Sequence, residues 1–179
     1  MALNPTIYKV ELAVSDMDRG YYASHSLTLA RHPSETEERL MMRLIAFALH
    51  ADSALEFGRG LSTEDEPDLW LKDATGVIDL WIEVGLPDER ELRRACGRAR
   101  RVVVLAYGAR KAAAWWEQNA AQLERNDNLR VLMIPAEVSP ALEQLTARSM
   151  SFTVTIQDGH VFFAGDAAQL EFAPRLLQS

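Results

Sequence analysis

The chain has 179 residues, the length of one domain, and its 48% hydrophobic and 25% charged residues are typical of a folded globular protein rather than a disordered one. Its apolar runs are far shorter than the roughly 20 residues of a membrane-spanning helix, and its first residues lack the pattern of a secretory signal. The single cysteine, Cys96, cannot form an internal disulfide. We therefore expect a cytoplasmic protein without a membrane partner.

Charge is distributed unevenly along the chain. The formal net charge of −7 opposes general binding to nucleic acid, because phosphate affinity comes mostly from Lys and Arg. Residues 88–111, however, contain eight basic and three acidic residues. This segment predicts either a basic patch on an acidic protein or an ordinary solvated helix face whose arginines favour helix formation.

The first third of the chain predicts a hairpin followed by a helix. Residues 6–14 and 21–30 alternate between apolar and polar side chains and flank a turn. A capping-box pattern of Ser34 and Glu37 then begins an apolar stripe of helical spacing that ends near Ala51. Glu37 projects toward the same side as that stripe, so it either places a carboxylate at the core or only closes the capping box.

The middle of the chain predicts alternating strands and helices. The predicted strands are residues 55–57, 67–72, 77–84, 102–107 and 129–134, and the predicted helices begin at Asp88 and Arg110. The strands at 67–72 and 77–84 form a hairpin, because a turn containing Gly76 separates them. The alternation favours right-handed crossovers and a mixed sheet covered by helices on both faces.

The last part of the chain predicts a short helix at residues 140–150 and a second hairpin, in which residues 152–157 and 161–164 flank Asp158-Gly159-His160. No repeat and no linker divides the sequence. We therefore expect a single domain over residues 1–179, with β-hairpins added at both ends of a mixed α/β core.

An adjacent tryptophan pair, Trp115 and Trp116, follows Arg110 and Lys111. Aromatic and basic side chains together suit the stacking of bases or sugars. One tryptophan of an adjacent pair on a helix usually faces the core, so core packing is the larger expectation and a stacking surface the smaller.

The acidic residues of the central hairpin carry the strongest chemical signal. Strand periodicity places Asp79, Trp81 and Glu83 on one face of the second strand. If the turn closes near Lys72, Asp68 on the first strand lies opposite Trp81 and diagonal to both acids, and diagonal neighbours are about 7–8 Å apart. Carboxylates at that spacing can reach one cation between them.

Converging carboxylates in an apolar core are costly without a counter-charge, because like charges raise one another's pKa and buried ions need partners. Mg²⁺ takes oxygen ligands and commonly uses only one or two protein carboxylates. The pattern therefore predicts either an Mg²⁺ or Mn²⁺ site at Asp68, Glu83 and Asp79, or neutralisation of these acids by Lys72 or nearby arginines.

Four stretches resemble the bacterial YaeQ family, and the resemblance covers essentially the whole chain. They are residues 26–36 (SLTLARHPSET), 64–70 (EDEPDLW), 78–90 (IDLWIEVGLPDER) and 95–97 (ACG). The resemblance implies a fold similar to that of the PD-(D/E)xK nuclease superfamily, whose core is a helix, a three-stranded meander, a helix and a further strand. We therefore expect a restriction-endonuclease-like mixed sheet flanked by helices, with its core at about residues 34–134.

The resemblance also implies roles for individual residues. Pro67 and Asp68 match the first half of the superfamily motif, and Glu83 matches the second. Glu37, on the first helix, matches the place where many such nucleases add another acid. Asp68 and Glu83 would then be metal ligands, with Glu37 or Asp79 as an accessory ligand or a water-orienting acid.

The sequence departs from the motif at Gly85. The motif calls for lysine there, where it would orient the attacking water and balance developing negative charge. Lys72 on the neighbouring strand, or Arg93 and Arg94 on the following helix, would have to deliver that cation. The fold is thus better supported by the resemblance than the activity is.

Two functional hypotheses follow. The first is a nuclease or phosphodiesterase-like protein that depends on Mg²⁺ or Mn²⁺ and acts on nucleic acid, with Arg93, Arg94 and Arg98 contacting the backbone of the substrate. The second is a nuclease fold that has lost catalysis and serves as a binding or regulatory module. Gly85 and the overall acidity favour the second hypothesis, and no pattern identifies a protein partner.

Overall fold

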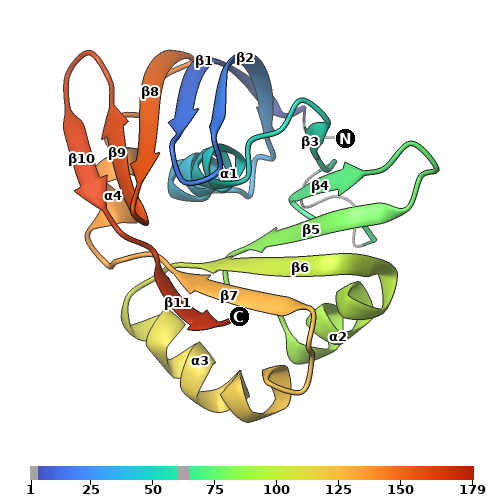
Figure 1. The fold of residues 1–179 in the computed structure, drawn as a ribbon. Coiled ribbons are helices and arrows are strands. Elements are labelled where there is room, and N and C mark those ends of the chain that lie inside the picture. Colours follow the sequence, from blue (N-terminus) through green and yellow to red (C-terminus); the bar gives the residue numbers. More distant parts are fainter. Residues whose placement is uncertain (1–3, 60–64) are drawn as a thin grey trace.

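The computed structural model describes residues 4–59 and 65–179 as two β-sheets and four helices arranged in layers (Figure 1). The five-stranded sheet has the order β10-β9-β8-β1-β2, and the six-stranded sheet has the order β11-β7-β6-β5-β4-β3. The strands are β1 (Thr6–Asp16), β2 (Tyr21–Arg31), β3 (Leu55–Phe57), β4 (Leu69–Lys72), β5 (Ile78–Val84), β6 (Ala99–Ala106), β7 (Leu129–Met133), β8 (Ser149–Gln157), β9 (His160–Ala164), β10 (Gln169–Phe172) and β11 (Arg175–Gln178). The helices are α1 (Glu37–Leu49), α2 (Glu89–Arg98), α3 (Arg110–Leu123) and α4 (Val138–Glu143). The fold is mixed α/β, as the sequence predicts.

Helix α1 lies between the two sheets, and α2 and α3 cover the opposite face of the six-stranded sheet (Figure 1). Nine consecutive residues of α1, from Leu40 to Ala48, are buried, because the helix has a sheet on two sides. The main core therefore joins the five-stranded sheet, α1 and the inner face of the six-stranded sheet. A second apolar cluster fills the space between the six-stranded sheet and α2 and α3.

The expected N-terminal and C-terminal hairpins are present, and they belong to one sheet. Strand β1 pairs with β2 in the antiparallel direction and with β8 in the parallel direction, and β8 pairs with β9. Val10, Leu12 and Val14 of β1 alternate into the core, which fixes the register of this sheet. The alternating pattern predicts each hairpin, but the pairing between the two hairpins joins segments far apart in the sequence.

Helix α1 begins later than the capping-box pattern predicts. Thr36 is the N-cap, and its Oγ1 accepts a hydrogen bond from the backbone N–H of Arg39 at 3.1 Å. Ser34 instead bonds to Nδ1 of His32, and Glu37 is the first helical residue. The predicted capping box of Ser34 and Glu37 is therefore wrong, because a turn before the helix moves its first residue past Ser34.

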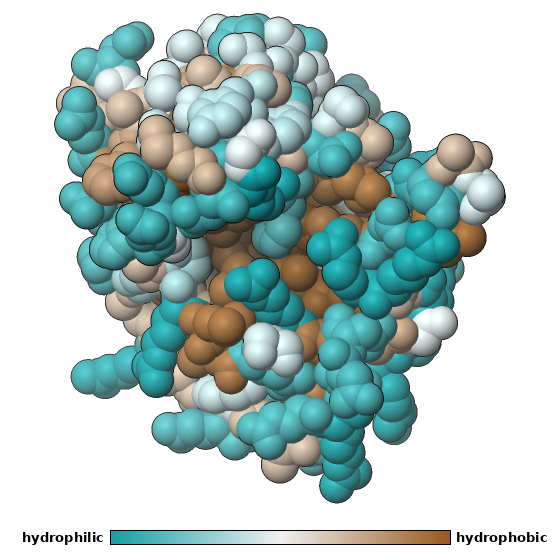
Figure 2. Space-filling view, viewed as in Figure 1, coloured by the Kyte–Doolittle hydropathy of each residue, from teal (hydrophilic) through white to brown (hydrophobic). Residues whose placement is uncertain are grey.

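The C-terminal part also differs from the prediction in detail. The expected helix at residues 140–150 is the shorter α4, and its last residues instead begin β8 at Ser149. Strands β10 and β11, which the sequence pattern does not predict, are four-residue strands at the edges of the two sheets. No helix within residues 4–59 and 65–179 is long and apolar enough to span a membrane. Figure 2 shows a mostly hydrophilic face whose hydrophobic side chains gather in a hollow near its centre.

Candidate functional site

The pairing of β4 with β5 decides where the predicted acids lie. Trp70 is opposite Trp81, so the register carries Asp68 toward Glu83 rather than toward Trp81. The turn closes through a hydrogen bond from Asp73 N to the Val77 oxygen, and the register shifts once more next to the turn. The predicted register was therefore wrong by two residues, because the sequence alternation shows neither the closing pair nor the bulge.

A cavity of about 740 Å³ brings Asp68 and Glu83 together, with α1 and α2 completing its wall. The charged residues that line it are the acids Asp65, Glu66, Asp68, Glu83 and Glu91 and the arginines Arg39, Arg94 and Arg98. When all of them are ionised, the described lining has an excess of two negative charges. The excess falls to one when Glu83 is protonated.

Asp68 is held on both of its oxygens and is only 6% exposed. Its Oδ2 accepts a hydrogen bond from the backbone N–H of Val84 at 2.7 Å, which ties the start of β4 to the end of β5. Its Oδ1 accepts a bond from Nη2 of Arg39 at 2.6 Å, which brings a guanidinium from α1 into the cavity. Each carboxylate oxygen keeps a further lone pair for another ligand.

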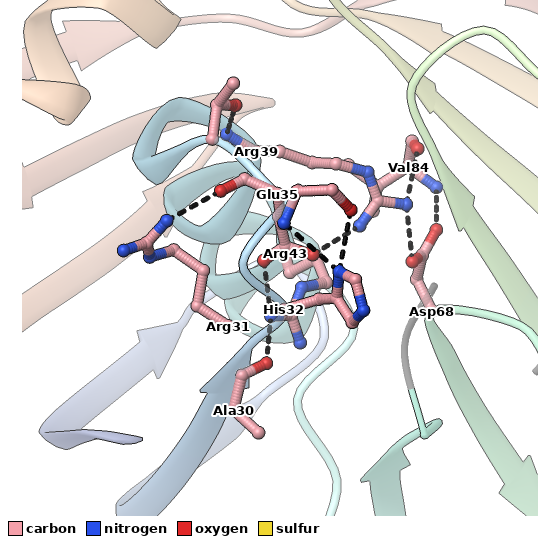
Figure 3. A network of polar contacts seen from close by, with 10 residues as sticks. Ala30, Arg31, His32, Glu35, Arg39, Arg43, Asp68 and Val84 are labelled. Atoms are coloured by element: carbon pink, nitrogen blue, oxygen red, sulfur yellow. Dashed lines mark hydrogen bonds and ion pairs between the residues drawn. The ribbon is translucent and has the colours of Figure 1, made fainter. Parts of the chain in front are cut away.

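Arg39 belongs to a buried ion network that the sequence interpretation missed (Figure 3). Glu35 accepts bonds from Nη1 of Arg39 at 2.9 Å and from Nη2 of Arg43 at 2.7 Å. Glu35 and Arg43 are 3% and 2% exposed. Two arginines four residues apart within an apolar helical stripe were the signal that could have revealed this network. Arg39 thus links Glu35 to Asp68 across the gap between α1 and the sheet.

Burial raises the pKa of Glu83 to about 8, and the negative charges of Asp68 and Glu91 contribute to the increase. The hydrogen bond that Trp81 Nε1 donates to Glu83 Oε1 at 2.8 Å opposes it, as does the charge of Arg39. A nearby cation would favour the ionised carboxylate. Glu83 is therefore a carboxyl group that keeps its proton at neutral pH, because the surrounding protein groups would balance its negative charge only in part.

Four predicted site residues do not line this cavity, and three of them are Asp79, Lys72 and Glu37. Asp79 accepts a hydrogen bond from Nη1 of Arg100 at 2.5 Å. The prediction that Asp79 lies diagonal to Asp68 is wrong, because the register of β4 and β5 differs from the predicted one. The Nζ of Lys72 lies 3.8 Å from the centre of the Trp70 ring. Glu37 is half-buried at the start of α1, where Glu35 and Arg39 provide the buried charges instead.

The three arginines that were expected to contact nucleic acid divide between two places. Arg94 and Arg98 line the cavity, and Arg98 also donates to the Asp65 backbone oxygen and lies over the Trp81 ring. Arg93 is exposed, with Nη1 3.6 Å from the carboxylate of Glu89. The α2 side of the cavity therefore provides two guanidinium groups at its rim.

Comparison with known proteins decides the family. Residues 1–174 match the sequence model of the family described as "YaeQ protein". The chain belongs to the YaeQ family. "Uncharacterized protein YaeQ" of Escherichia coli (strain K12) and its counterpart in Salmonella typhi are each 45% identical to the chain over 171 residues, which are 96% of this chain and 94% of theirs.

Solved YaeQ structures have the same fold. The crystal structure of YaeQ protein from Xanthomonas axonopodis pv. citri has a TM-score of 0.95 and 52% identity, covering 98% of this chain and 99% of that one. The structure from Pseudomonas syringae has a TM-score of 0.93 and 39% identity, covering 98% and 97%. The two-sheet arrangement is therefore the fold of YaeQ proteins.

The side chains that the described part of this YaeQ chain could offer as metal ligands are few. Within residues 4–59 and 65–179, no group of three or more His, Cys, Asp and Glu side chains is arranged to hold a metal ion. Asp68 and Glu83 do share the cavity, and Mg²⁺ commonly uses one or two carboxylates with water completing its shell. The oxygen donors and the excess negative charge fit a hard divalent cation in chemical type.

Proposed function

We propose that this YaeQ chain is a metal-dependent phosphodiester hydrolase that acts on nucleic acid, with its site in the cavity of Asp68 and Glu83. One observation carries the proposal: two acids from adjacent strands share this cavity with the guanidinium of Arg39, and the cavity has more negative than positive charge. The order α1, β3, β4, β5, α2, β6 supports it too, since it is the order that the PD-(D/E)xK resemblance implies.

Asp68 and Glu83 would hold Mg²⁺ or Mn²⁺ through their carboxylate oxygens. When bound, such an ion lowers the pKa of a coordinated water and neutralises phosphate charge. Glu83 suits this role because its ionised form lacks a full counter-charge. Val84 N and Arg39 fix the orientation of Asp68, so the first carboxylate would need no reorganisation.

Arg39 supplies a cation that the superfamily motif would place at Gly85. The φ of Gly85 is 114°, a conformation that residues with a side chain rarely adopt, so lysine there would be strained. Arg39 reaches the cavity from α1 and contacts Asp68 directly. Its remaining N–H groups would bind a phosphate oxygen and stabilise charge that develops during attack. Arg94 and Arg98 would position the backbone of the substrate at the rim.

The test is cleavage of labelled single-stranded and duplex DNA and RNA with Mg²⁺, Mn²⁺ or EDTA. We expect metal-dependent cleavage that Asp68→Asn and Glu83→Gln each reduce by at least 100-fold. Asp79→Asn is the matched control, because Asp79 is on the same strand as Glu83 but pairs with Arg100 outside the cavity. Absence of cleavage of every substrate by folded protein, or equal loss in all three variants, would refute the proposal.

A second candidate is a catalytically inactive nuclease-fold module that binds a ligand or regulates a partner. The observation that favours it is that both Asp68 oxygens already accept hydrogen bonds from within the protein. Calorimetric titration with Mn²⁺ separates the two candidates. Saturable Mn²⁺ binding that disappears in Asp68→Asn and persists in Asp79→Asn supports the enzyme. Absence of binding to the unchanged protein and to both variants supports the module.

A further inference from the structure

A second groove, of about 710 Å³, lies between α3 and the β7–β11 edge of the six-stranded sheet and has no role in the proposed hydrolase site. One wall is a stripe of α3 formed by Arg110, Ala113 and Trp116, and the other is the end of β7 with the edge strand β11. Its volume is within the roughly 300–1,000 Å³ of small-molecule sites. The groove therefore has the dimensions of a ligand site.

The floor of the groove is apolar. Trp116, Met133 and Leu177 are half-buried and pack against the second core cluster, while their remaining surfaces face the groove. Trp115, the other member of the tryptophan pair, is buried and donates from Nε1 to the Pro87 oxygen at 2.8 Å. The pair thus divides as its spacing predicts, and Trp116 is left with a surface on which a planar group can stack.

The mouth of the groove is basic. Arg110 and Arg175, the first residues of α3 and β11, both line it. At the opposite ends of the same elements, Gln178 Nε2 donates to the Leu123 oxygen at 2.8 Å, so α3 and β11 are joined there. Arg110 and Arg175 therefore lie at the ends of α3 and β11 farther from this contact.

Neither arginine has a carboxylate partner among residues 4–59 and 65–179, whereas Arg19, Arg39, Arg43 and Arg100 each have at least one. Glu117 is the acid that lines the groove, so the described lining has one net positive charge. An arginine pair beside an apolar floor complements a single anionic group attached to an apolar body. A polyanion such as nucleic acid would instead meet Glu117.

We propose that this groove binds a free aromatic monoanion of small-molecule size, with its ring against Trp116 and its charged group between Arg110 and Arg175. The site is independent of the hydrolase cavity, because the two cavities share no lining residue. The ligand class follows from the charge of the mouth, the apolar floor and the volume.

The test uses 1-anilinonaphthalene-8-sulfonate, an aromatic monoanion, and its uncharged analogue N-phenyl-1-naphthylamine. We expect saturable binding of the sulfonate, measured by the rise in its own fluorescence, and Trp116→Leu should weaken this binding at least fivefold because the stacking surface is lost. The double variant Arg110→Met/Arg175→Met should weaken sulfonate binding at least tenfold and leave the analogue unaffected. The matched control is Arg125→Met/Arg130→Met, which removes two exposed arginines that do not line the groove.

Several results would overturn the proposal. One is that folded protein shows no saturable binding of the sulfonate. Others are that Arg125→Met/Arg130→Met weakens binding as much as Arg110→Met/Arg175→Met does, or that Arg110→Met/Arg175→Met leaves it unchanged. Loss of binding in Arg94→Met would place the probe in the other cavity. Thermal unfolding of each variant shows whether it is folded. Cleavage activity reports only on the hydrolase cavity, so failure of one proposal is distinguishable from failure of the other.

Discussion

Arg39 is held between two buried carboxylates, Glu35 on one side and Asp68 on the other. Truncating it as Arg39→Met leaves Asp68 buried without its ionic partner, and breaking a buried pair in this way costs about 3 kcal/mol. We therefore expect the free energy of unfolding in urea to fall by about that amount. Arg39→Lys should lose less, because it keeps the charge but not the two-sided fork. A change in Arg39→Met no larger than that of an exposed arginine would contradict this account.

His50 at the end of α1 makes stability depend on pH. Burial lowers the pKa of His50 to about 4, and Arg19, Arg101 and Arg130 contribute to the decrease. The unfolded chain takes up a proton below the ordinary pKa of 6.5, whereas the folded protein does not until about pH 4. The stability that His50 contributes is therefore present above pH 6.5 and is lost as the pH falls toward 4, by about 3 kcal/mol. Glu83, whose pKa is raised to about 8, acts in the opposite sense below that pH. In urea unfolding, the free energy of the unchanged protein relative to that of His50→Asn should therefore fall across this range, and a constant difference would show that another group is responsible.

That Asp68 and Glu83 lie close together could be predicted, but the ion pair of Arg39 with Asp68 could not. Asp68 and Glu83 stand out because strand alternation and the motif place them on one face. Glu35, Arg39 and Arg43 precede or lie within a helix that looks amphipathic, and their burial depends on a sheet formed by distant hairpins. Only that tertiary arrangement shows that arginines in an apolar stripe are paired rather than solvated.

At the scale of the element, the start of α1 tests the difference between the sequence pattern and the structure. Thr36 Oγ1 caps the helix, whereas the exposed hydroxyl of Ser34 bonds to half-buried His32. We expect Thr36→Ala to lower the free energy of unfolding by about 1 kcal/mol, and Ser34→Ala to change it by less than about 0.5 kcal/mol. Thermal and urea unfolding measure the free energy of both variants. A larger loss in Ser34→Ala than in Thr36→Ala would show that Ser34 is the N-cap after all.

The central strands were predicted because their apolar runs are long and their turn residues clear. The register of β4 and β5 was not, because a bulge beside the turn adds a residue that alternation alone does not show. Strands β10 and β11 were missed for a related reason. Four residues are too few for a periodic signal, and these segments become strands by pairing with β9 and β7.

At the scale of the whole molecule, α1 is the element that both sheets share. Its contacts reach β1 and β2 in one sheet and β4 and β5 in the other, so neither sheet can retain its core if α1 unfolds. The arrangement predicts one cooperative unfolding transition for residues that lie in both sheets. Tryptophan fluorescence reports on the six-stranded half, because Trp70, Trp81, Trp115 and Trp116 all pack there.

Leu44→Ala in α1 tests this coupling. Leu44 is 1% exposed in the shared core, and such a truncation costs about 3 kcal/mol. The unfolding midpoint by tryptophan fluorescence and the hydrogen exchange of amides in β1 and β8 should both shift by the same free energy, because one core supports both sheets. Tyr22→Ala, at a side chain that is 63% exposed, should shift neither. Separate shifts of the two probes in Leu44→Ala would mean that the five-stranded sheet unfolds on its own, and α1 would then belong to the half with the six-stranded sheet alone.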